Sequence, residues 1–578
     1  MKYSNERAVQ LLISLLKQHN IKKIIASPGT TNITFVASAM HDPWFEIFSS
    51  VDERAAAYMA CGLAEESQEP VVLSCTGATA SRNYMPGLTE AYYRKLPILA
   101  VTASQSYDKI GHLSPQLIDR TNVPNDVVRR SFIVKAIRDA DEEWVDEIAI
   151  NNAILELTRH GGGPIHLNFQ TTYSRDYNVD NIVPARKIDR IFPKTKVWPS
   201  LSGKRVGIMI ASHKPFSKEE IKTIDRFCGQ YDAVVFTDHT SAYNGEYKVL
   251  MSLPFMQRKD VHPIAKIDIL IHMGGINGDP SYPILQPKEV WRIDEDGELR
   301  DPFRKLTYVF EMSDITFFEH YAQEDYKYNS FLVECQNAYN AVRDNVPELP
   351  FSNVWIASQT AHRIPSGSTI HLGILNTLRS WNYFHLPKNV RSNSNVGGFG
   401  IDGILSTLIG ASLNNRKQLY YAVLGDLAFF YDMNAIGNRH VGNNVRIMLV
   451  NNGRGTEFRN YDHPGAAFGE EADNFIAAAG HYGNKSKHLV KNYAENLGFE
   501  YMSASNKDEY LKHVERFLTP EITDRPMLFE VFTDSQDESD ALDMIQHIKE
   551  SASVAVKEVA RNILGDKGIK TIKSILGR

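Results

Sequence analysis

The sequence predicts an α/β protein built from three doubly wound domains with mostly parallel sheets. Short apolar runs alternate with helical patterns along most of the chain, which is typical of parallel sheets with helices on both faces. The alternation stops and restarts twice. At about 100–200 residues per domain, 578 residues correspond to three or four domains. With 43% hydrophobic and 23% charged residues, the composition is that of a globular protein.

The first predicted domain covers residues 1–182. It opens with an amphipathic segment around Ala8 to Leu16, and a Pro- and Lys-rich stretch at 181–202 follows it as a linker. Its expected strands are Ile21–Ser27, Val71–Thr76, Ile98–Thr102 and a run at 163–168, and its expected helices are Ala55–Glu66 and Asn83–Arg94.

A central α/β domain is predicted at residues 183–345 and a third domain at 346–550. The central strands are expected at Arg205–Ala211, Ala233–Thr237, Ile267–Met273 and Val290–Ile293, before a largely helical stretch at 313–345. The third-domain strands are expected at Thr369–Leu372, Leu419–Leu424, Ile447–Val450 and Met527–Phe532.

Residues 551–578 form a basic tail with apolar residues at helical spacing. We expect a helix that docks on the protein's own surface or on a sister subunit. The alternative is a basic amphipathic helix that contacts a membrane or another partner.

Composition excludes several classes of function. A net charge of −6 provides no bulk attraction for nucleic acid or an anionic membrane. The four cysteines show no CxxC spacing, which disfavours a zinc site or a disulfide framework. The sequence has no signal peptide pattern and no apolar run of the ~20 residues that a membrane span needs. We therefore expect a cytoplasmic protein with small-molecule partners.

The clearest chemical motif follows two neighbouring third-domain strands. Gly425, Asp426 and Leu427 follow one strand, and Asn452 ends the next. Parallel strands end at the same edge of a sheet, where α/β proteins bind ligands. A carboxylate, an amide oxygen and the carbonyl of Arg454 are oxygen ligands of the kind Mg²⁺ prefers. Each half of this motif also occurs in ordinary strand ends and turns, so their coincidence carries the prediction.

Glu53 is the second candidate, at the start of a small-residue helix that follows an apolar strand. A glutamate at a helix N-terminus is commonly a surface residue that stabilises the helix dipole. In a chain that also carries the metal motif, a catalytic acid that holds a proton is the stronger interpretation, and it requires desolvation.

Together these residues resemble the thiamine diphosphate enzymes of the acetolactate synthase and pyruvate decarboxylase type. The family signature is Gly-Asp-Gly, about two dozen residues and then Asn-Asn; here Leu427 replaces the third residue and 23 residues intervene. The resemblance extends to the loops at 27–31 and 76–83 and to the segment at 163–168. The resemblance implies thiamine diphosphate and Mg²⁺ as cofactors, with active sites between subunits of a dimer or tetramer. It assigns Glu53 to the aminopyrimidine, Asp426, Asn452 and Arg454 to the metal, Gln116 to the reacting carbons and Gly29, Gly77, Gly425, Leu427 and Phe458 to the cofactor. His112, near Gln116, is either a proton carrier or an ordinary loop histidine.

Segments 400–407 and 425–434 resemble one branch, the 2-succinyl-5-enolpyruvyl-6-hydroxy-3-cyclohexene-1-carboxylate synthases of the menaquinone pathway. In that branch a carbanion from 2-oxoglutarate adds to isochorismate. The resemblance makes Ile401 the residue that bends the cofactor and assigns the backbone of Phe399 to its amino group.

Three arginines of that branch are replaced by neutral residues. Thr30 and Thr31 stand in the first loop, and neutral residues fill 104–106 and 395–397. Because neutral side chains cannot pair bidentately with carboxylates, we expect an acceptor other than isochorismate.

Arg379 is retained, and in the branch it holds the distal carboxylate of the donor. This retention favours 2-oxoglutarate as donor, with pyruvate next. Glu457 replaces an apolar residue, either as a general acid or contact for a hydroxylated substrate, or as a solvent-facing loop carboxylate. The sequence thus predicts a 2-oxo acid decarboxylase and carboligase. The alternatives are a simple decarboxylase that releases an aldehyde, a flavoprotein of the acetolactate synthase type, and a non-catalytic binding or assembly member of the fold.

Overall fold

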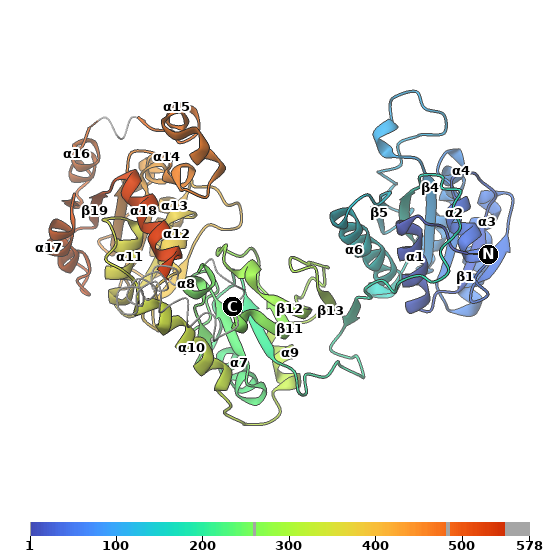
Figure 1. Ribbon diagram of the computed structural model, residues 1–578, viewed down its shortest axis with the longest axis horizontal. Helices are drawn as coiled ribbons and strands as arrows, with labels where there is room; N and C mark the ends of the chain where they lie inside the picture. The colour runs from blue at the N-terminus through green and yellow to red at the C-terminus, as the bar shows by residue number, and fades with distance from the viewer. Residues whose placement is uncertain (1, 258–261, 481–485, 549–578) are drawn as a thin grey trace, which may run out of the picture. The chain divides into compact units, whose positions relative to one another are not determined.

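The computed structural model describes residues 2–257, 262–480 and 486–548. It divides into two compact units, one of residues 1–192 and 296–311 and the other of the remaining residues. The described residues form three parallel sheets with helices between the strands, so the predicted fold class is confirmed (Figure 1). The basic tail at 551–578 lies outside the described residues.

The sheet of the first unit contains six strands in the order β2-β1-β3-β4-β6-β5. Its strands are β1 (Lys23–Ala26), β2 (Glu46–Ser49), β3 (Val71–Thr76), β4 (Ile98–Ser104), β5 (Arg130–Val134) and β6 (Ile165–Gln170). Its helices are α1 (Arg7–Gln18), α2 (Ile33–Met40), α3 (Glu53–Ser67), α4 (Thr79–Asn83), α5 (Met85–Arg94) and α6 (Ala140–Glu156).

Alternating strand residues bury two separate hydrophobic cores on opposite faces of this sheet. On β3, Val72 belongs to the core beneath α1, α2 and α6, whereas Val71 and Leu73 belong to the core beneath α3 and α5. Successive side chains of a strand point to opposite faces, so a strand that is apolar throughout requires a layer of helices on each side.

The second unit carries a five-strand parallel arrangement in the order β10-β9-β8-β11-β12. Its elements are β8 (Val206–Ile210), α7 (Lys218–Tyr231), β9 (Val234–Thr237), β10 (Lys248–Val249), α8 (Ser252–Phe255), β11 (Lys266–Met273), β12 (Gln286–Ile293), α9 (Asp314–Tyr321) and α10 (Ser330–Arg343). The parallel pair β7 (Asp189–Ile191) and β13 (Leu306–Phe310) belongs to the first unit. The predicted linker at 181–202 therefore contains a short strand.

The third sheet, also in the second unit, has the order β15-β14-β16-β17-β19-β18. Its strands are β14 (Thr369–Leu372), β15 (Arg391–Asn393), β16 (Tyr420–Gly425), β17 (Val445–Asn451), β18 (Glu500–Ala504) and β19 (Met527–Phe532). Its helices are α11 (Asn353–Thr360), α12 (Asn376–Trp381), α13 (Ile404–Ser412), α14 (Asp426–Tyr431), α15 (Ala472–Phe475), α16 (Leu489–Asn496), α17 (Lys507–Phe517) and α18 (Ser535–Gln546).

Two cores again lie on the two faces of this sheet. Tyr421 and Val423 pack with α11, α12, α17 and α18, while Ala422 and Leu424 pack with α13, α14 and α16. Figure 1 shows α11 and α18 over the same sheet, where they contact each other. With both faces covered, the carboxyl edge remains open to loops, which is where the motif residues lie.

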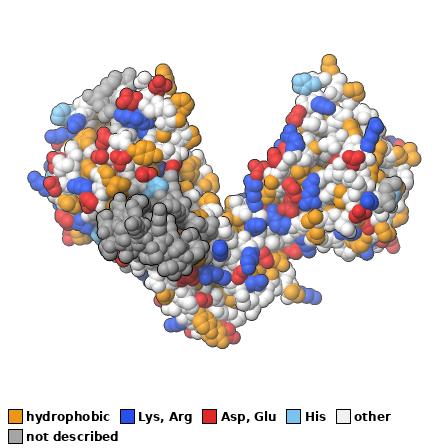
Figure 2. Space-filling model, in the orientation of Figure 1, with side chains coloured by type: hydrophobic (Ala, Val, Ile, Leu, Met, Phe, Trp, Pro, Cys, Tyr) orange, Lys and Arg blue, Asp and Glu red, His pale blue; other side chains and the backbone are white. Residues whose placement is uncertain are grey.

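The surface is mixed in charge. Figure 2 shows Lys and Arg side chains interspersed with Asp and Glu over the visible face of each unit. Among the described residues no helix is long and apolar enough to cross a membrane. All four cysteines are buried and unpaired.

Helix α3, which begins at Glu53, packs closely against α5. A Cβ atom on Gly87 of α5 would lie 2.5 Å from Cβ of Ala57 on α3. We expect Gly87→Ala to lower the free energy of unfolding by about 1–2 kcal/mol, because overpacking outweighs the gain in helix propensity. Denaturant titration of the purified protein measures this change.

Gly62→Ala in α3 is the matched control. Its Cβ would have no heavy atom within 4 Å, so we expect equal or higher stability. Equal effects of the two substitutions would contradict this account of the helix contact.

Candidate active site

Asp426 and Asn452 lie together at the carboxyl edge of the third sheet, as expected from their strands. Gly425 pairs with Val450 across β16 and β17, so the two strands end side by side. The buried carboxylate of Asp426 accepts a hydrogen bond from the backbone N–H of Gly453 at 2.8 Å and from that of Leu427 at 3.0 Å. Gly453 takes a φ of +79°, which favours glycine and turns its N–H toward Asp426.

The side-chain oxygen of Asn452 is buried and has no hydrogen-bond partner among the described residues. Its amide instead hydrogen-bonds to Glu538, a buried carboxyl at the start of α18. Burial raises the pKa of Glu538 to about 7, while hydrogen bonds from Thr533, Asn353 and Asn452 oppose that rise. An orphaned buried oxygen beside a carboxylate fits a cation ligand.

The side chain of Arg454 is fixed by an ion pair, and its backbone carbonyl follows Asn452 in the chain by two residues. Its guanidinium pairs with Asp473 at 2.8 and 2.9 Å, and its carbonyl accepts the N–H of Thr456 at 3.0 Å. Asp473 also pairs with Arg459 at 2.9 Å. A carbonyl with one hydrogen bond retains a second lone pair for a ligand. Asp426, Asn452 and this carbonyl are oxygen groups of the kind that Mg²⁺ prefers.

The remaining third-domain candidates lie in the loops at this edge. Phe399 adopts a φ of +54° and is 42% exposed. Ile401 is partly buried and packs against both cores of the sheet. Phe458 is half-buried, with its ring 5.2 Å from that of His463.

Arg379 and Glu457 are paired with each other. The guanidinium donates two hydrogen bonds to the carboxylate, at 2.7 and 2.9 Å. Glu457 is only 17% exposed, so the interpretation as a solvent-facing loop carboxylate is wrong. Burial opposes the charge of Arg379, but the hydrogen bonds and charge of Glu457 raise its pKa.

In the first unit, Glu53 begins α3 as predicted. The side chain of Asp52 caps the helix by accepting the N–H of Ala55 at 2.8 Å. Glu53 is half-buried, and the amide of Asn83 donates to its carboxylate at 3.3 Å. The sequence analysis did not identify Asn83, although it lies at the end of the small-residue loop next to Glu53.

Gly29 and Gly77 allow the loops at the strand ends to pack closely. A Cβ on Gly29 would lie 2.2 Å from Oγ1 of Thr76, and one on Gly77 would lie 2.6 Å from the guanidinium of Arg120. Thr31 is buried and donates to the carbonyl of Ala103 at 2.5 Å, whereas Thr30 is exposed.

Gln116 and His112 are exposed residues of the loop between β4 and β5. Neither side chain hydrogen-bonds to Glu53 in the described structure. The backbone of Gln116 has a positive φ of +63°.

Arg120, four residues after Gln116, was missed by sequence analysis and is only 4% exposed. It donates to Ser104 at 2.9 Å and Tyr107 at 3.1 Å. Its sequence context contains no signal that distinguishes it from a surface arginine.

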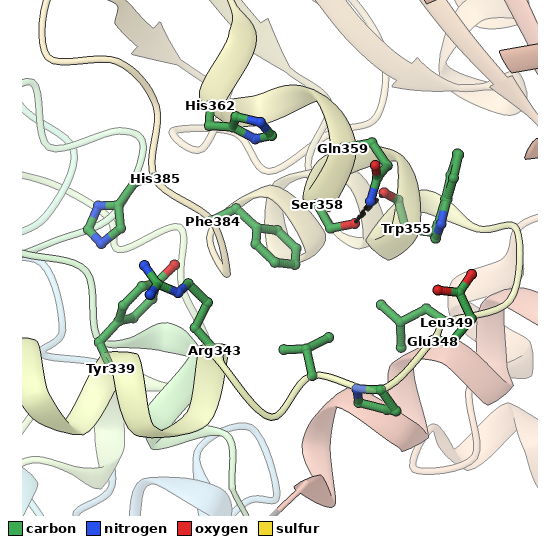
Figure 3. A pocket seen from close by; sticks show the side chains of 12 residues that line it. Tyr339, Arg343, Glu348, Leu349, Trp355, Ser358, Gln359, His362, Phe384 and His385 are labelled. Carbon is green, nitrogen blue, oxygen red and sulfur yellow. Dashed lines mark hydrogen bonds between the residues drawn. The ribbon is translucent and has the colours of Figure 1, made fainter. Parts of the chain in front are cut away.

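A separate cavity of about 440 Å³ contains none of the predicted site residues. It lies between α10 and α11, and its walls include Tyr339, Trp355 and Phe384 (Figure 3). Ser358 and Gln359 hydrogen-bond to each other at its edge. The chemistry expected from the sequence does not depend on this cavity.

Comparison with known proteins found similarity in the first unit and along most of the chain. Residues 6–123 match the family model "Thiamine pyrophosphate enzyme, N-terminal TPP binding domain". Three similar proteins are each named 2-succinyl-5-enolpyruvyl-6-hydroxy-3-cyclohexene-1-carboxylate synthase. The one from Phocaeicola vulgatus is 29% identical over 94% of this chain and 99% of its own length. The one from Bacteroides fragilis is 28% identical over the same shares, and the one from Desulfotalea psychrophila 26% over 89% and 96%.

The domain match lies on the six-stranded unit that carries Glu53, and the similarity to the relatives continues through the sheet that carries Asp426 and Asn452. Together with the three parallel α/β sheets, these findings show that the chain belongs to the superfamily of thiamine-diphosphate-dependent enzymes.

Proposed function

We propose that this protein uses thiamine diphosphate and Mg²⁺ to decarboxylate a 2-oxo acid and to transfer the resulting acyl carbanion to an acceptor other than isochorismate. The observation that carries the proposal is the buried, unpartnered oxygen of Asn452 beside the carboxylate of Asp426. A buried polar atom of this kind is normally satisfied by a protein group, by water or by a bound ligand.

The third domain would hold the diphosphate end of the cofactor. Asp426, Asn452 and the carbonyl of Arg454 would supply three of the six oxygens that Mg²⁺ requires, with phosphate oxygens and water supplying the others. A Cβ on Gly425 would point into open space, so this position leaves room for phosphate near the backbone.

The first domain would hold the pyrimidine end, with Glu53 presenting a proton from its carboxyl group to N1′. Asn83 orients that carboxylate through its 3.3 Å hydrogen bond. When bound, thiamine diphosphate supplies a nucleophilic carbon and an electron sink, while the protein provides orientation and protonation control. Ile401 and the backbone of Phe399 would fix the bend between the two ends.

Self-association into a dimer or tetramer would complete the site. Glu53 is only half-buried within its own chain, and a carboxyl that retains a proton at neutral pH must be desolvated. Exposed apolar side chains surround this end of the first unit, namely Val51 (79%), Tyr58 (49%), Met59 (45%) and Tyr93 (69%). An apolar surface of this kind is typical of a protein interface. We propose that a second copy of the chain covers it, and that the protein acts in the cytoplasm.

The proposed acceptor is the point at which this protein differs most from its relatives. Their name specifies a succinylated cyclohexene carboxylate as product. By the resemblance, the first loop of that branch carries an arginine, whereas this chain has Thr30 and Thr31 there. Thr31 is also buried and already donates its hydroxyl hydrogen bond to Ala103. Neutral residues in this loop do not provide the charge that an anionic acceptor needs. We therefore propose a carbonyl or activated acceptor. A simple decarboxylase that releases an aldehyde is the second candidate.

Asn451 and Asn452 provide a sharp test of the metal site. Asn452→Leu should abolish the rise in Tm that Mg²⁺ and thiamine diphosphate together cause, because it removes an oxygen ligand.

Asn451 is also buried, but its amide donates to Glu530 at 2.8 Å. Asn451→Leu should destabilise the free protein by about 1–3 kcal/mol and keep the cofactor-induced rise, since it leaves a buried acceptor unpaired. Differential scanning calorimetry with and without ligands measures both. Retention of the full rise in Asn452→Leu would refute the ligand assignment.

Glu53→Gln tests the protonation role. We expect kcat for CO₂ release to fall by about 10²–10⁴, since the amide cannot exchange a proton with the pyrimidine. Isothermal titration calorimetry should show that the cofactor still binds. Glu66→Gln, at an exposed position of the same helix, should leave kcat unchanged. Turnover of Glu53→Gln within twofold of wild type would refute the protonation role of Glu53, and a wild type that releases no CO₂ would favour the non-catalytic alternative.

A substrate screen decides between ligation and simple decarboxylation. Cofactor-loaded protein should release CO₂ from a 2-oxo acid and form a larger product only when a carbonyl acceptor is present. Mass spectrometry of the products identifies the acceptor. Aldehyde as the sole product would favour the second candidate. Rapid ligation of a 2-oxoglutarate-derived carbanion to isochorismate would refute the account of the missing arginines.

A further inference from the structure

The ion pair between Arg379 and Glu457 closes a small polar network beside a cavity. Arg379 lies on α12 and Glu457 on the turn Thr456–Arg459, five residues after Asn452. Their side chains are only 16% and 17% exposed, and both hydrogen bonds are shorter than 3.0 Å. The geometry is that of a bidentate guanidinium–carboxylate pair, in which the two charges cancel locally.

Two asparagines fix the pair in place. The oxygen of Asn376 accepts from Arg379 at 3.3 Å and from the amide of Asn460 at 3.2 Å. The same Asn460 amide donates to Glu457 at 3.2 Å. Asn460 is 5% exposed, and its own oxygen is buried without a partner in the described structure. This part of the network therefore presents an acceptor, not a donor, to a ligand.

The cavity beside this network has a volume of about 220 Å³ and is lined by Arg379, Glu457 and Asn460. Asp462 and Asp543 also contribute to its walls, against Arg379 and His463 as the basic side chains. A carboxylate that entered this cavity would meet acidic side chains and an arginine whose guanidinium is already hydrogen-bonded to Glu457. To bind that carboxylate, Arg379 would have to leave Glu457 as a buried unpaired charge, which is costly.

We propose that the Arg379–Glu457 pair selects the donor, and that the donor is a 2-oxo acid with a short, uncharged side chain such as pyruvate. This inference rests on the proposed function, because it takes the cavity as the place of the donor side chain. The carboxylate at C1 does not distinguish the donors, since every 2-oxo acid loses it as CO₂. Only a second carboxylate, as in 2-oxoglutarate, would meet Glu457.

The proposal reverses the ranking that the sequence suggests. The arginine at position 379 favours 2-oxoglutarate only if its guanidinium is free to bind the distal carboxylate of that donor. The structure assigns that guanidinium to Glu457 instead. Because the charge of Glu457 neutralises that of Arg379, the paired guanidinium no longer prefers an anionic ligand to a neutral polar one.

Steady-state kinetics of CO₂ release by the full-length, cofactor-loaded protein provides the test. We expect wild type to have at least about a tenfold higher kcat/KM for pyruvate than for 2-oxoglutarate, which corresponds to 1.4 kcal/mol. Glu457→Gln keeps the size of the side chain but removes its charge and replaces one of the two oxygens that accept from Arg379 by an NH₂ group, which releases the guanidinium. It should shift the ratio of the two kcat/KM values toward 2-oxoglutarate by about tenfold or more.

The double variant R379M/E457L is the matched control. It removes both charges and should restore the wild-type preference, because replacing a buried ion pair by apolar side chains of similar volume is well tolerated. A gain for 2-oxoglutarate that persists in the double variant would show that Arg379 does not cause it, and would overturn the proposal.

Binding of glutarate to the cofactor-free protein gives a readout that does not depend on turnover. Glutarate should raise the Tm of Glu457→Gln but not of wild type, and butyrate, which has one carboxylate, should raise neither. A wild type that binds glutarate, or that prefers 2-oxoglutarate to pyruvate, would overturn the donor assignment while leaving decarboxylation intact. If the loaded protein released CO₂ from no 2-oxo acid, the proposed function itself would fail, and the donor assignment with it.

Discussion

The hydrogen bond from Gly453 to Asp426 joins the two chain segments on which the candidate site depends. It forms because β16 and β17 are parallel neighbours that end at the same level of the sheet. The loops after both strands therefore lie side by side, and they carry a carboxylate, an amide oxygen and a backbone carbonyl. Glu538 extends this arrangement from the next strand along, because β19 pairs with β17 and leads into α18.

Helices on both faces of each sheet restrict where chemistry can occur. The strands of the first and third sheets bury side chains alternately in two cores, so neither face of these sheets is open to a ligand. Polar side chains that bind a ligand therefore have to lie in the loops at the strand ends. The same packing explains the many close contacts at glycine, since Gly29, Gly77 and Gly87 each stand where a Cβ atom would overlap a neighbouring loop or helix.

Charge is distributed differently in the two half-sites. Near its candidate site the third domain contains internal ion pairs, with Asp473 bridging two arginines and Glu457 neutralising Arg379. Glu53 of the first unit has only the amide of Asn83 as a hydrogen-bond partner in the described structure, and exposed apolar side chains lie around it. Because Glu53 is only half-buried within its own chain, the proposed chemistry depends on self-association to exclude water from it.

The sequence by itself determined the fold class and the central strands, and its assignment of the two half-sites remains a proposal. Strands β3, β14 and β19 have the bounds expected from their apolar runs, because strands buried on both faces are continuously hydrophobic. The edge strands β2, β5, β15 and β18 were not predicted, since an edge strand is short and partly exposed and lacks that signal. The pairing of Arg379 with Glu457 was decided only by the tertiary structure. The two residues are 78 positions apart, and nothing local in either segment indicates that folding brings their charges together.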